Sequence, residues 1–171
     1  MKSAFIKEFI KRISSFFNDS SFELITPVSS TDFKLRNLEE YVYTYNVSFI
    51  NKFPRVKKAF SIYKKNRIIK NLKRVDLYHI HYLDDYTSYV SKAIDKKSMA
   101  VITSIWGSDF YRADNELRKM QKKIYDLSEK ITFANRNTLQ EFDEYYDFNY
   151  SDKLRICKFG LSTLDEIKKK F

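Results

Sequence analysis

Glycine, proline and cysteine are scarce in this chain of 171 residues, which holds two glycines, two prolines and one cysteine. Two glycines cannot build a P-loop or the GxGxxG dinucleotide fingerprint, so both kinds of nucleotide site are excluded. The single cysteine, Cys157, cannot form an internal disulfide, which agrees with a reducing cytoplasm. Because so few positions are free to adopt a positive φ, Gly107 and Gly160 are expected where the backbone needs glycine.

Long apolar runs are also missing. No stretch of the sequence is long and apolar enough to predict a transmembrane helix. Charged residues interrupt the N-terminal segment at Lys7, Glu8 and Lys11, so it does not have the pattern of a secretory signal. The length and the 43% hydrophobic content are typical of one globular domain. We therefore expect residues 1–171 to form a single cytoplasmic domain.

Positive charge is in excess, with a formal net charge of +10. Such an excess favours contact with an anionic partner, or it reflects a generally lysine-rich surface. The sequence carries no recognised nucleic-acid motif, so we do not expect a nucleic acid. Apolar spacing predicts a helix over residues 56–73 whose other face is basic, a pattern that suits adsorption to an anionic membrane but is also common on solvated helices. The apolar residues predicted to face inward are Val56, Ala59, Phe60, Ile62, Tyr63, Ile68, Ile69 and Leu72. The basic residues of the other face are Lys57, Lys58, Lys64, Lys65, Arg67, Lys70 and Lys73.

Strand and helix patterns alternate along the chain. Helices are predicted at residues 5–17, 56–73, 85–95, 114–128 and 137–146, and strands at 22–26, 77–83, 99–105, 130–134 and 154–159. A further short strand is weakly indicated around residues 41–47. The alternation is typical of right-handed βαβ units. The sequence therefore predicts a Rossmann-like, three-layer α/β/α domain with a mainly parallel sheet.

Ligands of open α/β sheets bind beyond the carboxyl ends of the strands. The segment after the predicted strand 99–105 is the richest in chemistry: it offers an aromatic face, a permissive backbone, a hydroxyl, a carboxylate and a guanidinium at Trp106, Gly107, Ser108, Asp109 and Arg112. Asn135 and Gly160 follow two later strands at the same predicted edge. Alternatively, this segment is a tight strand-to-helix turn with Asp109 as the N-cap.

Two histidines stand two positions apart on the strand 77–83, so His79 and His81 should point to the same face. The chain has no third histidine and no nearby carboxylate set to complete a metal site, and we expect no bound metal. His81, nearer the strand end, is a candidate for ligand contact. The adjacent Asp84 and Asp85 are interpreted as a cap for the next helix rather than as an acid pair.

Four motifs in order, DLYHIHYL, VITSIWGSDFYR, SEKITFANRNTLQEF and KLRICKFGL, resemble the N-terminal, acceptor-side domain of GT-B glycosyltransferases. The closest type is the family-4-like enzymes of bacterial surface polysaccharide synthesis. The resemblance implies that the loop of Gly107, Ser108 and Asp109 faces the acceptor or the transferred sugar. It also implies that Phe159 and Gly160 mark the exit toward a donor-binding domain.

The resemblance has departures. The family usually begins with a strand and a glycine-rich loop, whereas this chain begins almost inside the following helix. Trp106 stands where many members carry histidine. The donor-binding domain is absent, so the chain alone should hold no cofactor and no nucleotide-sugar, and such a domain could be supplied in trans. Asp109 is the candidate catalytic residue. The expected acceptor is a glycan or a lipid-linked glycan at the inner face of the plasma membrane.

Two other functions stay open at this point. The chain could be a non-catalytic module that supports a partner transferase, or a basic protein that lies on a membrane surface.

Overall fold

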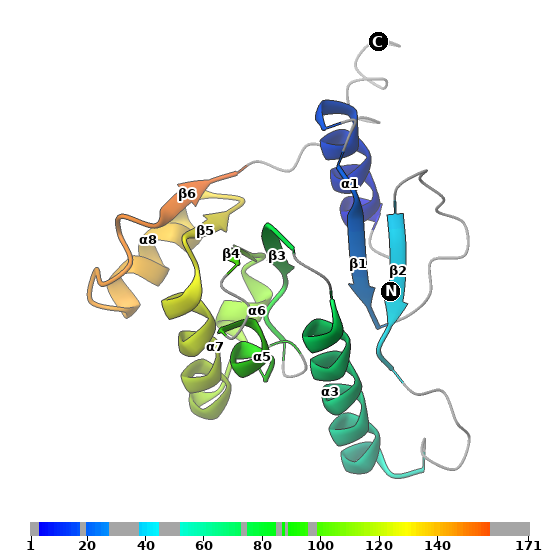
Figure 1. Cartoon of the computed structure of the whole chain (residues 1–171). Helices are drawn as coiled ribbons and strands as arrows, with labels where there is room; N and C mark the ends of the chain where they lie inside the picture. Colours follow the sequence, from blue (N-terminus) through cyan, green and yellow to red (C-terminus); the bar gives the residue numbers. More distant parts are fainter. Residues whose placement is uncertain are drawn as a thin grey trace, which may run out of the picture. The chain divides into compact units, whose positions relative to one another are not determined.

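The computed structural model describes residues 4–17, 20–27, 38–44, 52–72, 75–84, 87, 89–95 and 99–157. The chain divides into two compact units. The first comprises residues 1–44 and 159–171, and the second comprises residues 45–158. The predicted site residues from His81 to Asn135 all lie in the second unit. Figure 1 labels the helices and strands along the chain.

The first unit contains helix α1 (Ala4–Phe16) and strands β1 (Phe22–Thr26) and β2 (Leu38–Val42). The two strands pair in parallel over their full length. The backbone N–H of Tyr43 donates to the Thr26 carbonyl at 3.1 Å and extends the ladder by one residue. The weakly indicated strand around residues 41–47 thus begins at Leu38, because pairing with all of β1 sets its register.

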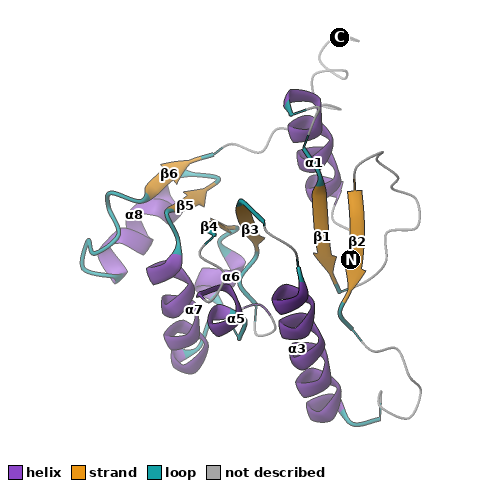
Figure 2. Ribbon diagram, viewed as in Figure 1, coloured by secondary structure: helices purple, strands orange, loops and turns teal. Residues whose placement is uncertain are grey.

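The second unit alternates helix and strand, as the sequence predicts (Figure 2). All four of its strands are parallel, in the spatial order β3-β4-β5-β6. This is the alternating α/β arrangement of a Rossmann-like domain. Its elements are α3 (Pro54–Asn71), β3 (Leu77–His81), α5 (Ser91–Asp95), β4 (Ala100–Ile105), α6 (Ser108–Tyr111), α7 (Asn115–Leu127), β5 (Lys130–Phe133), α8 (Arg136–Tyr145) and β6 (Leu154–Ile156).

One face of this sheet carries the core. Side chains alternate along a strand, so Val101, Thr103 and Ile105 of β4 share a face, and all three are buried. Phe133 of β5 lies on the same side and meets Phe142 of α8, with ring centroids 5.1 Å apart. The ring of Phe142 in turn packs edge-on against a tyrosine of α7, which places both helices over this face. The described residues establish this helix layer, and the third layer stays a prediction.

Helix α3 is turned differently from the prediction. Its buried stripe runs through Ser61, Lys65 and Ile69, which are spaced at i, i+4 and i+8. Lys65 was expected on the solvated basic face but is only 4% exposed, and its Nζ donates to Thr87 Oγ1 at 2.8 Å. Tyr63, expected inside, is 62% exposed. Ile69 and Leu72, expected inside, are buried. Apolar and basic residues are mixed around this helix, so apolar spacing alone predicted its inward face only in part.

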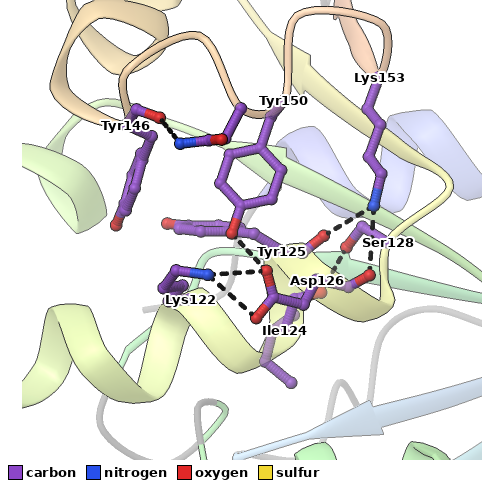
Figure 3. A network of polar contacts seen from close by, with 9 residues as sticks. Lys122, Ile124, Tyr125, Asp126, Ser128, Tyr146, Tyr150 and Lys153 are labelled. Carbon is purple, nitrogen blue, oxygen red and sulfur yellow. Dashed lines mark hydrogen bonds and ion pairs between the residues drawn. The ribbon is translucent and has the colours of Figure 1, made fainter.

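A polar network fixes the C-terminal end of α7 to the loop before β6 (Figure 3). The Tyr150 hydroxyl donates to Asp126 Oδ1 at 2.5 Å, and Lys122 Nζ reaches the same carboxylate at 3.1 Å. Lys153 Nζ donates to the carbonyls of Tyr125 and Asp126 at 3.5 and 3.2 Å. The last carbonyls of a helix have no partner within it, so Lys153 supplies donors that the helix lacks. The network lies where β5 and β6 begin, at the edge of the sheet opposite the candidate site.

Candidate functional site

The carboxyl ends of β3 and β4 lie side by side, because His81 and Ser104 are partners in the parallel register. The segments that follow these two strands therefore meet at one edge of the sheet. Together with the start of α7 they line a cavity of about 260 Å³ that is open to the surface. Three predicted site residues, Ser108, Asp109 and Arg112, line it. The other lining residues are Tyr82, Leu83, Asp84, Ala113 and Leu117.

Gly107 makes the turn that leads into the cavity wall. Its φ is +89°, a backbone conformation that residues other than glycine rarely adopt. Its carbonyl accepts the backbone N–H groups of Phe110 and Tyr111 at 2.9 and 2.8 Å, which starts the short helix α6. The expectation that Gly107 stands where the backbone needs glycine is confirmed. Gly160 lies outside the described residues.

Asp109 ties the two loops of the site together. Its Oδ2 accepts the Leu83 N–H at 3.1 Å and its Oδ1 accepts the Trp106 N–H at 2.9 Å. The residue is only 5% exposed. Burial raises the pKa of its carboxyl, and hydrogen bonds from backbone N–H groups act against that rise. The N-cap interpretation is wrong, because Gly107 caps α6 and Asp109 lies within its first turn.

Gln121 is a structural part of the site that the sequence analysis missed. This α7 residue is fully buried, and its Nε2 donates to the carbonyls of Leu83 and Asp109, both at 2.8 Å. Together, Asp109 and Gln121 hold the backbone of Leu83 on both sides, by its N–H and by its carbonyl. A signal was present: Gln121 falls four residues after Leu117 and three before Ile124, so a helix over residues 114–128 places it on the same face as these two apolar residues.

His79 and His81 share a face of β3, as predicted, and their rings stack with centroids 4.0 Å apart. His79 Nε2 lies 2.8 Å from Ser104 Oγ, which lies 2.7 Å from Thr132 Oγ1 on the next strand. Burial lowers the pKa of His79 to about 4 and that of His81 to about 3, so both rings are neutral at physiological pH. Within the described part of the chain, no three His, Cys, Asp or Glu side chains gather to hold a metal ion.

The His81 ring lies 6.3 Å from that of Trp106, centroid to centroid. Neither residue lines the 260 Å³ cavity, so their ligand contacts stay predictions. Asn135 caps α8, with its Oδ1 accepting the Thr138 N–H at 2.8 Å. The Thr138 hydroxyl accepts a hydrogen bond from Tyr111 at 3.3 Å, which links α8 to α6 beside the site. Asn135 also lies outside the cavity lining.

Asp84 belongs to both the cavity and a cap. Its Oδ1 accepts the Thr87 N–H at 2.8 Å, which agrees with its interpretation as a cap; Asp85 lies outside the described residues. The Thr87 hydroxyl accepts a hydrogen bond from the buried ammonium of Lys65. Burial lowers the pKa of Lys65 to about 8, and the nearby Asp84 carboxylate opposes that change. Helix α3 is thus joined to the wall of the cavity.

The cavity combines groups that suit a polyhydroxylated molecule with an anionic substituent. The Ser108 hydroxyl and the Asp84 carboxylate can form hydrogen bonds with hydroxyl groups, and the exposed guanidinium of Arg112 can bind a phosphate or carboxylate. Tyr82 and Leu117 offer apolar surface to the faces of a sugar ring.

Comparison with known proteins identifies the family of the chain. None of the curated proteins is significantly similar to the chain. In the described part of the chain, no helix is both long enough and apolar enough to cross a membrane. A family model described as "Glycosyl transferase 4-like" matches residues 6–139, well over half of the chain, and the matched region contains the whole cavity lining. The chain therefore belongs to the glycosyl transferase 4-like family.

Proposed function

We propose that this chain is the acceptor-side half of a glycosyltransferase, with the 260 Å³ cavity as the acceptor-binding site. The observation that carries the proposal is the meeting of Ser108, Asp109 and Arg112 around one cavity at the carboxyl ends of β3 and β4. This edge of the sheet is where ligands of open α/β domains bind. Membership of the family supports a sugar-bearing substrate.

The proposed acceptor is a glycan, or a lipid-linked glycan, that belongs to surface polysaccharide synthesis at the cytoplasmic face of the plasma membrane. Arg112 would bind the phosphate of a lipid-linked acceptor, because a guanidinium offers two parallel N–H donors to phosphate oxygens. The sugar ring would lie over the apolar residues Tyr82 and Leu117. The nucleotide-sugar donor would be bound by a second domain, covalently attached or supplied in trans.

We propose that Asp109 acts mainly as a positioning residue. Both of its carboxylate oxygens already accept backbone N–H groups, from Leu83 and Trp106. A carboxylate held in this way shapes the cavity and is poorly placed to take a proton from an acceptor hydroxyl. Direct catalysis by Asp109 stays a prediction.

Binding of a short-chain prenyl diphosphate sugar, measured by isothermal titration calorimetry, tests the acceptor assignment. Arg112→Gln should weaken binding about tenfold or more, because a charge-assisted phosphate contact contributes about 1.5–3 kcal/mol. Arg136→Gln is the matched control: Arg136 is an exposed arginine in the first turn of α8, outside the cavity lining, and its loss should change the affinity less than twofold. Equal effects of the two variants, or no binding to the parent chain, would contradict the proposal.

A second candidate function is a binding module that supports a separate catalytic chain. The engagement of the Asp109 carboxylate by two backbone N–H groups favours this candidate, since it leaves that residue to build the site. Co-expression with a candidate donor-binding chain distinguishes the two. Sugar transfer that requires both chains and is abolished by Arg112→Gln would indicate a split enzyme. Transfer that is unaffected by this variant would indicate a non-catalytic binding module.

A further inference from the structure

The net charge of the protein is concentrated in one segment. Residues 41–75 contain ten lysines and arginines and no aspartate or glutamate, whereas the whole chain has 32 basic and 22 acidic residues. The rest of the chain therefore holds 22 residues of each sign and is neutral. Helix α3 and its flanks are the source of the +10 charge.

The outward face of α3 mixes this charge with apolar side chains. Its buried stripe passes through Ser61, Lys65 and Ile69. Residues on the opposite side of the helix cylinder follow the same spacing of three and four positions, and are exposed: Val56, Phe60, Tyr63, Arg67 and Lys70. The apolar members are 44%, 47% and 62% exposed in that order.

We propose that this outward face of α3, defined by Val56, Phe60, Tyr63, Arg67 and Lys70, docks onto an anionic lipid surface. Lysine and arginine beside the helix are attracted to acidic headgroups, while the phenyl, phenol and isopropyl groups enter the boundary between headgroups and acyl chains. Charge complementarity selects the lipid, because no acidic residue within residues 41–75 opposes an anionic surface. The surface differs from the basic face expected from the sequence, since Lys65 faces inward and aromatic groups face outward.

Helix α3 is linked to the cavity by hydrogen bonds. Lys65 on its buried stripe donates to Thr87, whose N–H is held by Asp84 of the cavity lining. The helix that carries the docking face is thus connected by two hydrogen bonds to the cavity. Docking would hold that cavity close to the membrane surface. The inference stands on charge and exposure and does not depend on the proposed acceptor.

Vesicle flotation of the full chain tests the inference. The parent chain should bind vesicles of equal parts phosphatidylglycerol and phosphatidylcholine at 0.1 M salt, and bind pure phosphatidylcholine at least tenfold more weakly. The charge variant Arg67→Gln with Lys70→Gln should lose about tenfold or more in affinity for the anionic vesicles. Its matched control is Lys119→Gln with Lys123→Gln, which removes the same charge from exposed positions of α7 and should change binding less than twofold.

A second pair tests the apolar contribution. Val56→Ser with Tyr63→Ser should weaken vesicle binding several-fold, whereas Tyr89→Ser with Phe148→Ser, at comparably exposed positions elsewhere, should not. Circular dichroism must show the same helix content for all variants. Equal losses in test and control pairs would overturn the proposal, as would absence of binding to anionic vesicles. If the charge variant lost binding to DNA but kept its binding to vesicles, the face would be assigned to nucleic acid. If it lost a dimer detected by light scattering, the face would be assigned to a second copy of the chain.

Discussion

At the scale of the residue, the candidate site depends on a few side chains and one backbone conformation. Asp109 binds the N–H of Leu83 and Gln121 binds its carbonyl, and Gly107 supplies the positive φ that starts α6. Asp109 lies in α6 and Gln121 in α7, yet both bind the loop after β3. The cavity is therefore held by contacts between loops that are distant in the sequence.

Gly107→Ala should destabilise the fold by about 1–3 kcal/mol, because alanine is strained at the φ of +89° found here. The added Cβ would lie 3.5 Å from the Tyr111 ring, an ordinary contact, so the cost comes from the backbone. Urea denaturation measures the change. The neighbouring Ser108→Ala should stay within about 0.5 kcal/mol of the parent. A fully stable Gly107→Ala variant would show that the turn does not need glycine.

The stacked histidines predict an acid dependence of stability. The pKa of His79 is lowered to about 4 and that of His81 to about 3, so between pH 6.5 and these values the unfolded chain binds more protons than the folded one. Stability is therefore retained above pH 6.5 and falls as the pH drops toward 4. Over this pH range, the free energy of unfolding of the His79→Gln variant should fall by about 1–3 kcal/mol less than that of the parent, as measured by urea titrations. Identical pH profiles for the two proteins would contradict the burial of a neutral His79.

Gln121→Met should cost about 1–3 kcal/mol of stability, because the carbonyls of Leu83 and Asp109 lose a buried donor while the volume is nearly kept. It should also weaken acceptor binding, since both carbonyls belong to residues that line the cavity. Gln121→Glu, protonated at low pH, should recover part of the affinity there. An unchanged affinity in a destabilised Gln121→Met variant would restrict Gln121 to a role in folding.

At the scale of the element, helix ends are where polar side chains contribute most. Asp114 and Asn135 cap α7 and α8 through hydrogen bonds of 2.8 Å to the N–H groups of Leu117 and Thr138. Lys153 donates hydrogen bonds to two carbonyls at the opposite end of α7. These contacts fix both helices between successive strands of the sheet, which is how the loops at the carboxyl edge acquire their positions.

Lys153→Met should destabilise the fold by about 1 kcal/mol, because two carbonyls at the end of α7 lose their charged donor. Lys122→Met is the control. Lys122 forms an exposed ion pair with Asp126, and such pairs contribute little, so its loss should stay within about 0.5 kcal/mol. Thermal unfolding of the two variants compares them directly. A larger effect at Lys122 would contradict this assignment.

Much of the element order was predictable, for physical reasons that differ between elements. Buried parallel strands read as apolar runs, so the strand at Ala100–Ile105 was predicted within one residue. Helix α7 was predicted nearly to its ends, because one apolar stripe dominates it. Helix α3 was located correctly but turned wrongly, since a buried lysine is stabilised by Thr87, a partner 22 residues away that no local pattern encodes.

The candidate site could also be predicted only in part. Its position at the carboxyl edge follows from the parallel topology, so Ser108, Asp109 and Arg112 were found from sequence order alone. The Asp109 carboxylate accepts two backbone N–H groups because of how two loops meet, and no local sequence pattern encodes that meeting.

At the scale of the whole molecule, charge and chemistry are separated along the chain. The family match covers residues 6–139 and includes both the basic segment 41–75 and the cavity lining. The cavity edge combines carboxylates, a hydroxyl and one guanidinium, whereas the segment around α3 is purely cationic. This separation is what a transferase half would need in order to remain at a membrane through α3 while the cavity holds a glycan or a phosphate-bearing, lipid-linked glycan.

The most direct test of the acceptor assignment is a map of backbone amide shifts in the ¹⁵N-labelled chain during titration with a short-chain prenyl diphosphate sugar. We expect the amides of Tyr82, Leu83 and Asp84 and those from Ser108 to Ala113 to shift together, with one binding constant. Shifts confined to α3, to the loop before β6, or to no contiguous region would contradict the assignment of this cavity as the acceptor site.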